Sequence, residues 1–186
     1  RSDFLRDWKA ADDSVHVVPH GILAGFVQPG ESLEGTGVGD PPGPGLIFGR
    51  MLPYKGLNVF SEALPKIVGA LPEARFLVAG RGPSLDEVRD QLAAFDQVEI
   101  RDEYIQSEEV AELYRRASVN LAPYIEASQS GVIAAGYAFG VPSIASRVGA
   151  LPEVVVHEEN GLLVEPGNPD SFADAVIRYL SDAKLR

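Results

Sequence analysis

Short apolar runs rich in β-branched residues alternate with longer segments of helical period along nearly the whole chain. The expected strands are Val15–Val18, Leu46–Phe48, Phe76–Ala79, Val98–Ile100, Val119–Ala122, Ser143–Ala145 and Leu162–Val164. The expected helices are Leu57–Ala70, Leu85–Phe95, Glu108–Ala117, Val132–Phe139 and Ser171–Leu180. Such alternation builds a parallel sheet with helices on both faces. The sequence therefore predicts the α/β class, with a doubly wound parallel sheet.

Three of these helices carry candidate start signals. Ser84 is followed three residues later by Glu87, Ser107 precedes two glutamates, and Pro169 stands just before the last helix. Serine hydroxyls accept hydrogen bonds from the free amides of a first helical turn, where proline is also tolerated. We therefore expect Ser84 and Ser107 to cap their helices.

The domain organisation follows from length and from one loop-like stretch. A chain of 186 residues with 45% apolar composition is expected to form one domain. We expect residues 1–14 to be a lead or linker from a missing N-terminal domain and residues 15–186 to be that one domain. Residues 29–45, rich in glycine, proline and acids, predict a flexible loop. The short polar lead and the end near a helix suggest truncation on both sides.

The charge of −11 disfavours binding to nucleic acid or to an anionic membrane surface, since both need clustered lysine and arginine. No apolar run is long enough to cross a bilayer, and the first residues lack a signal-peptide core. The chain has no cysteine, and its three histidines show no ligand spacing, so we expect no metal site. A small anionic ligand is still compatible with this composition, because it needs only a few positioned cations.

The first segment with chemical potential is the turn from Gly49 to Gly56, which lies between an expected strand and an expected helix. Ligands of open parallel sheets bind beyond the carboxyl ends of the strands, so this turn places Arg50 and Lys55 beside that crevice. Together they could neutralise a leaving diphosphate. The alternative reading is that Lys55 is solvated and that Arg50 pairs with a nearby acid.

The second segment runs from Ala122 to Gly131 and leads into an apolar helix. Small residues at a helix start leave backbone amides open to a phosphate, and the helix dipole adds to the attraction. Ser130 and Gly131 are the candidates for that contact. Glu126 could accept hydrogen bonds from sugar hydroxyls, or it could be an acid that the helix dipole favours without any function.

The third segment is the glycine turn Gly80-Arg81-Gly82-Pro83, which follows an expected strand. It begins like a dinucleotide-binding fingerprint, but Pro83 and Ser84 interrupt the pattern before a third glycine. The turn is therefore either a tight strand-to-helix connection or a surface that lies against a nucleotide base.

Taken in order, these segments resemble the C-terminal domain of the family 4 (group 1) glycosyltransferases, over the chain from Val15 to Leu180. The resemblance implies a Rossmann-like domain that forms the C-terminal half of a two-domain GT-B fold. It implies that Arg50 and Lys55 bind the diphosphate of a nucleotide-sugar donor. The further donor-binding residues that it implies are Gly49, Gly80, Tyr104, Ile105, Gln129, Ser130, Gly131 and Val132.

The sequence departs from the family's Glu-x7-Glu motif. Glu126 takes the place of the first glutamate, which contacts the donor sugar in the family, but it stands one residue too far upstream. Ala135 occupies the place of the second glutamate, which contacts the ribose. Another group then holds the ribose, or the nucleotide binds weakly, or the site has degenerated.

The resemblance implies a donor-binding domain of a retaining enzyme that moves a hexosyl group to an acceptor held by the missing N-terminal domain. Arg50, Lys55 and Glu126 are the expected catalytic residues, with a UDP-, GDP- or ADP-sugar as substrate and no cofactor or metal. We expect no nucleic acid partner, no membrane contact by this fragment and a cytoplasmic location, with the full-length enzyme at the cytoplasmic face of a membrane as an alternative. The rival functions are a noncatalytic nucleotide-binding or interaction module and, less favoured, a nicotinamide-dependent oxidoreductase.

Overall fold

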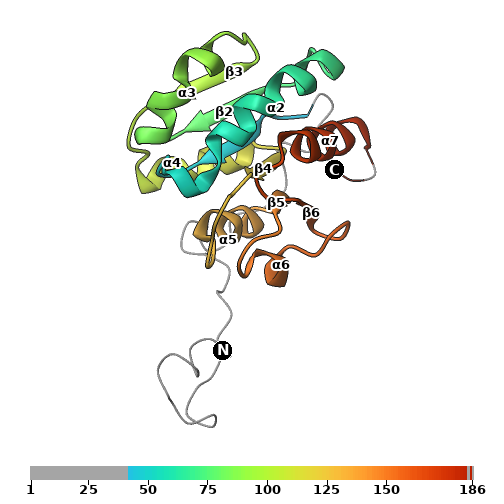
Figure 1. Ribbon diagram of the computed structural model, residues 1–186. Coiled ribbons are helices and arrows are strands. Elements are labelled where there is room, and N and C mark those ends of the chain that lie inside the picture. Colours follow the sequence, from blue (N-terminus) through green and yellow to red (C-terminus); the bar gives the residue numbers. More distant parts are fainter. Residues whose placement is uncertain (1–41, 184, 186) are drawn as a thin grey trace.

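The computed structural model describes residues 42–183 and 185, and these residues form one parallel sheet with helices on both faces (Figure 1). The strands are β1 (Gly45–Phe48), β2 (Phe76–Ala79), β3 (Val98–Arg101), β4 (Val119–Ala122), β5 (Ser143–Ser146) and β6 (Gly161–Val164). All of their pairings are parallel, and their order is β3-β2-β1-β4-β5-β6. The predicted α/β class and the doubly wound sheet are confirmed.

The helices divide between the two faces of the sheet. They are the short 3-10 helix η3 (Pro53–Lys55) and the α-helices α2 (Leu57–Ala70), α3 (Pro83–Ala93), α4 (Ser107–Arg116), α5 (Gly131–Ala138), α6 (Leu151–Val154) and α7 (Pro169–Ser181). One buried apolar cluster joins α2, α3 and α7 to one face of the sheet, and two others join α4, α5 and α6 to the opposite face. The strands are short and mostly buried because helices cover both sides.

The predicted elements agree with these bounds within about two residues, and two short helices, η3 and α6, were not predicted. The predicted strand at Val15–Val18 and most of the predicted loop at 29–45 lie outside the described residues. Gly45, the last residue of that predicted loop, belongs to β1.

The predicted caps were wrong in register. Gly82 is the N-cap residue of α3, and the Ser84 hydroxyl is buried without a hydrogen-bond partner among the described residues. Gln106, one residue before Ser107, caps α4 through a capping box with Glu109. The Met51 carbonyl oxygen accepts from the Ser84 amide at 3.1 Å, and it also requires glycine at position 82, because a Cβ there would lie 2.5 Å from it.

Candidate functional site

The candidate site lies at the carboxyl ends of β1 and β4. β2, which follows β1 in the chain, pairs with one edge of β1, and β4 pairs with its other edge. The strand order therefore reverses between β1 and β4. This switch point leaves a crevice in which open α/β sheets bind their ligands. The turn after β1 carries Arg50 and Lys55, and the loop after β4 leads to Ser130 at the start of α5.

Lys55 is the best-defined side chain of the site, and it is only 5% exposed. Its Nζ donates hydrogen bonds to the Phe48 carbonyl oxygen at 3.0 Å and to the Tyr124 hydroxyl at 3.0 Å. Burial lowers the pKa of Lys55 from its ordinary 10.5 to about 8. Gly49 has a positive φ of 107°, and a Cβ there would lie 3.1 Å from the Lys55 Nζ. The turn therefore needs glycine at this position to leave room for the ammonium group.

The start of α5 faces the same space as Lys55. A cavity of about 250 Å³, here called the lysine cavity, is lined by Phe48, Tyr54, Lys55, Tyr124, Gln129, Ser130, Gly131, Val132 and Ala135. The Ser130 hydroxyl caps α5 by accepting from the Ile133 amide at 3.2 Å. The amides of Gly131 and Val132 have no hydrogen-bond acceptor within the described part of the chain. A cation and free helix-start amides thus line one small space, an arrangement suited to an anion.

A second and larger cavity adjoins the first, and Phe48 lines both. This cavity of about 750 Å³, here called the wide cavity, lies over β1, β2 and β3. Its lining is Phe48, Gly49, Arg50, Leu52, Gly80, Arg81, Gly82, Pro83, Asp86, Asp102, Glu103, Tyr104, Ile105, Ser107 and Val110. Its volume is in the range of pockets that hold ligands of nucleotide size.

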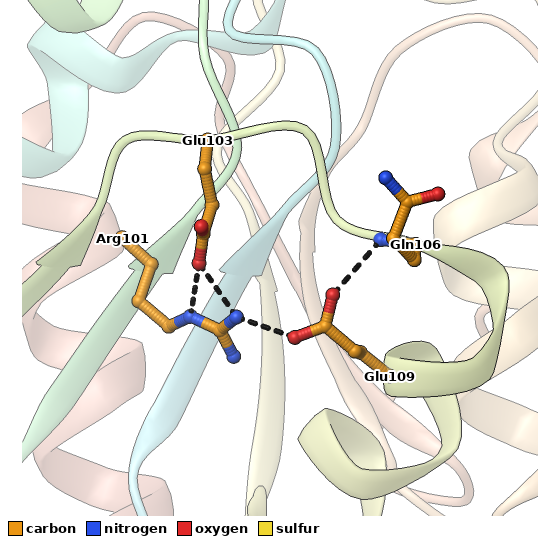
Figure 2. A network of polar contacts seen from close by, with 4 residues as sticks. All are labelled: Arg101, Glu103, Gln106 and Glu109. Carbon is orange, nitrogen blue, oxygen red and sulfur yellow. Dashed lines mark hydrogen bonds and ion pairs between the residues drawn. The ribbon is translucent and has the colours of Figure 1, made fainter.

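The acidic side chains that line the wide cavity are paired with arginines. Arg89 bridges Asp86 and Asp102. Figure 2 shows Arg101 between Glu103, at 2.6 Å, and Glu109, at 2.7 Å.

Two arginines that line the wide cavity form no such ion pairs with the described residues. The side chains of Arg50 and Arg81 are exposed, and no hydrogen bond or ion pair holds them among residues 42–183 and 185. Despite the negative net charge of the whole chain, the wide cavity therefore presents available positive charge to a ligand.

The predicted site residues fall into two groups. Lys55, Gln129, Ser130, Gly131 and Val132 line the lysine cavity, as does Ala135, which occupies the place of a family glutamate. The residues that line the wide cavity are Gly49, Arg50, Gly80, Tyr104 and Ile105.

Glu126 belongs to neither group, because its side chain is exposed and lines neither cavity. Its role toward the donor sugar stays a prediction. Lys55 and Arg50 lie in neighbouring cavities rather than in one, so a ligand that meets both must extend across the boundary at Phe48.

Two residues of the site were missed by the sequence analysis. Arg81 lines the wide cavity, and its place in the glycine turn that follows β2 was a signal that could have identified it. Tyr124 contacts both Lys55 and Ser130. No local pattern marks Tyr124, because its contact with Lys55 joins residues 69 positions apart.

The described part of the chain offers neither a metal site nor a membrane-spanning helix. No group of three or more His, Cys, Asp or Glu side chains there is placed to hold a metal ion. None of the helices within those residues has the length and apolar character needed to span a bilayer.

Comparisons with known proteins agree with this geometry. A family model described as glycosyl transferases group 1 matches residues 45–182. An uncharacterized glycosyltransferase of Methanocaldococcus jannaschii is 34% identical over 144 residues, which cover 76% of this chain and 36% of that protein. The sucrose-phosphate synthase of Thermosynechococcus elongatus has a TM-score of 0.73 at 26% identity, over 99% of this chain and 48% of that one.

The C-terminal domain of a group 1 glycosyltransferase from Francisella tularensis has a TM-score of 0.68 at 27% identity, and the match covers 89% of this chain and 90% of that domain. By contrast, this chain spans less than half the length of the two longer relatives. The predicted resemblance and the Rossmann-like half of a GT-B fold are thereby confirmed. The chain belongs to the group 1 glycosyltransferase family.

Proposed function

We propose that this chain is the donor-binding domain of a retaining glycosyltransferase and that it holds the diphosphate of a nucleotide-sugar. One observation carries the proposal: the buried Lys55 ammonium and the free amides at the start of α5 line one cavity at the switch point of the sheet. The adjoining wide cavity has room for the nucleoside, and Arg50 lines that cavity.

The chemistry of this arrangement is stabilisation of a leaving group. When the bond between the sugar's anomeric carbon and the diphosphate oxygen breaks, its electron pair stays on the diphosphate. Lys55, Arg50 and the amides of Gly131 and Val132 would neutralise that developing charge. Because these cations and amides do the neutralising, the proposal requires no metal ion.

The remaining parts of the proposal concern the whole protein. A hexosyl group would pass with retention to an acceptor held by an N-terminal domain, from a UDP-, GDP- or ADP-sugar. This chain by itself would bind the nucleotide without turnover, because the acceptor side of the cleft belongs to the other domain. The proposal includes a cytoplasmic location and no partner among nucleic acids or membranes for this part of the protein.

The test is calorimetry of UDP, GDP and ADP with the wild-type chain and with Arg50→Ala and Lys55→Ala. We expect at least one nucleotide to bind, and we expect each substitution to weaken that binding by about tenfold or more, as charge-assisted contacts do. Arg75→Ala is the matched control, since this exposed arginine lies at the opposite end of β2 and pairs with Glu73. Equal affinities in all four proteins would contradict the proposed site.

Ala135, which occupies the place of a family glutamate, favours a second candidate function: a noncatalytic interaction module with the same fold. It is 2% exposed and packs among apolar residues, so no acid of the described residues lines this part of the lysine cavity. The absence of binding heat with all three nucleotides would favour the module. Binding of NADH without any binding of sugar nucleotides would instead favour a nicotinamide-dependent oxidoreductase.

A further inference from the structure

A chain of buried hydrogen bonds connects Lys55 to the start of α5 through Tyr124. The Tyr124 hydroxyl lies 3.0 Å from the Lys55 Nζ and 3.3 Å from the Ser130 Oγ. The Lys55 Nζ is 5.0 Å from the centroid of the Tyr124 ring, so the ammonium lies nearer the phenolic oxygen than the centre of the ring. Tyr124 itself is 3% exposed, and the ring of Tyr54 packs edge-on against it. Three side chains from different segments are thereby fixed relative to one another.

The ammonium group of Lys55 sets the direction of its hydrogen bond to Tyr124. An ammonium group can only donate, so the Tyr124 oxygen must accept from Lys55. Either hydroxyl can donate in the contact between Tyr124 and Ser130, and in one of the two arrangements the Tyr124 hydroxyl donates to the Ser130 Oγ. That oxygen also accepts from the Ile133 amide, which occupies both of its lone pairs. In this arrangement the hydroxyl hydrogen of Ser130 has no other acceptor among the described residues and is left for a ligand.

We propose that Tyr124 is a positioning residue of the diphosphate site: it orients the Lys55 ammonium and the Ser130 hydroxyl so that both donate to one anion. This inference rests on the proposed function, because it concerns the same site. Lys55 has three donors, of which residues 42–183 and 185 engage two, and the third is left for the ligand. The ligand would therefore meet a row of donors from Lys55, Ser130, Gly131 and Val132.

The arrangement depends on the proton of Lys55. The charged or titratable groups that act on Lys55 are Tyr54 from η3, Arg50 from the turn after β1 and Tyr124 from the loop after β4, whereas α5 presents no charged group to the cavity. When Lys55 loses its proton, its nitrogen can accept, and the Tyr124 hydroxyl can turn toward it and away from Ser130. Anion binding is then expected to weaken as the pH rises through the pKa of Lys55, about 8.

The test is calorimetry of UDP between pH 6.5 and 9.5 with the wild type and with Tyr124→Phe. Loss of the hydroxyl removes an acceptor from the ammonium, which lowers the pKa of Lys55 further. We expect about tenfold weaker binding at pH 7 and a midpoint of the pH profile that moves to lower pH. Tyr137→Phe is the matched control: Tyr137 lies on α5, its hydroxyl donates to Asn160, and it lines neither cavity. We expect the affinity and the midpoint of this control to equal those of the wild type.

The possible outcomes separate the two proposals. If the wild type binds no nucleotide, the proposed function falls and this inference falls with it. If the wild type binds UDP and Tyr124→Phe keeps the same pH midpoint, only the positioning role is overturned, even where the variant is less stable.

A second measurement uses the wild type alone and applies if Tyr124→Phe does not fold. With tyrosine labelled by ¹³C at Cζ, the Tyr124 signal is expected to move as the pH passes about 8, although the pKa of Tyr124 is raised to about 12. A signal that does not move between pH 7 and 9 would overturn the positioning role.

Discussion

At the scale of single residues, the burial of the Lys55 ammonium group lowers the stability of the folded chain. The side chain is 5% exposed, and its pKa is lowered from 10.5 to about 8, mainly by burial, so the fold disfavours the charged form of Lys55 by about 3 kcal/mol. Its hydrogen bonds to Phe48 and Tyr124 hold the ammonium in place. A buried cation kept under these conditions is typical of a functional site rather than of a stabilising one.

We therefore predict that Lys55→Met stabilises the chain at pH 7 by about 1–2 kcal/mol, because methionine fills the space without a charge to desolvate. Urea unfolding measures this difference. Lys66→Met is the control, since Lys66 is an exposed lysine paired with Asp170 and Asp174, and we expect no gain from it. A Lys55→Met variant less stable than the wild type would contradict the prediction.

The stability difference between Lys55→Met and the wild type should become smaller as the pH rises. Below pH 8 both the folded and the unfolded wild type hold the Lys55 proton, and the full desolvation cost is present. Between pH 8 and 10.5 only the unfolded state keeps this proton, so the wild type gains stability relative to Lys55→Met as the pH rises. Urea unfolding at pH 7, 9 and 10.5 is expected to show the gap closing, and a gap that widens would refute the assignment.

At the scale of elements, the site depends on the close approach of two loops from adjacent strands. Gly56 joins η3 to α2 with a φ of 66°, and a Cβ there would lie 1.9 Å from the Pro123 carbonyl oxygen. The Ile125 amide donates to the Tyr54 carbonyl oxygen at 2.8 Å across the same junction. This contact brings Lys55 within reach of Tyr124.

Gly56→Ala is predicted to destabilise the chain by about 3 kcal/mol or more, because the new methyl group forces the two loops apart. Gly140→Ala has a similar φ of 69° but nothing within 4 Å of the new Cβ, so it should lose only about 1 kcal/mol, the cost of left-handed backbone. Thermal unfolding of both variants checks the comparison. Equal losses would show that backbone conformation alone, and not the loop contact, requires glycine at position 56.

The loop after β3 supports the electrostatics of the wide cavity through the ion pairs in Figure 2. Arg101→Gln is predicted to weaken UDP binding severalfold, because Glu103 would then face the ligand unpaired, while stability changes little. Arg116→Gln is the control, since it breaks an exposed pair with Glu99 away from both cavities. Calorimetry at low and high salt tests the charge effect, which high salt should reduce.

At the scale of the whole molecule, a chain with a net charge of −11 is proposed to bind an anion. The fold resolves this conflict by pairing the acids around the wide cavity and leaving Arg50 and Arg81 available. We predict that UDP raises the melting temperature in a concentration-dependent way and that the shift is the same in EDTA as in Mg²⁺. A shift that appears only with Mg²⁺ would contradict the proposed metal-free site.

The sequence by itself determined the elements and their order. Strands such as Phe76–Ala79 and helices such as Leu57–Ala70 were predicted with the bounds that the structure has, because period and composition are local properties. The order of the motifs that contain Arg50, Lys55 and Gly131 likewise predicted the family to which the chain belongs.

Only the tertiary structure decided how these parts meet. The pairing of β1 with β4 brings Tyr124 to Lys55 over 69 positions, and the loop at Met51 makes Gly82, rather than Ser84, the N-cap residue of α3. The tertiary structure also divided the expected single site into two adjoining cavities and left Glu126 outside both. These outcomes depend on distances between segments that the strand order sets, and no local pattern of residues contains those distances.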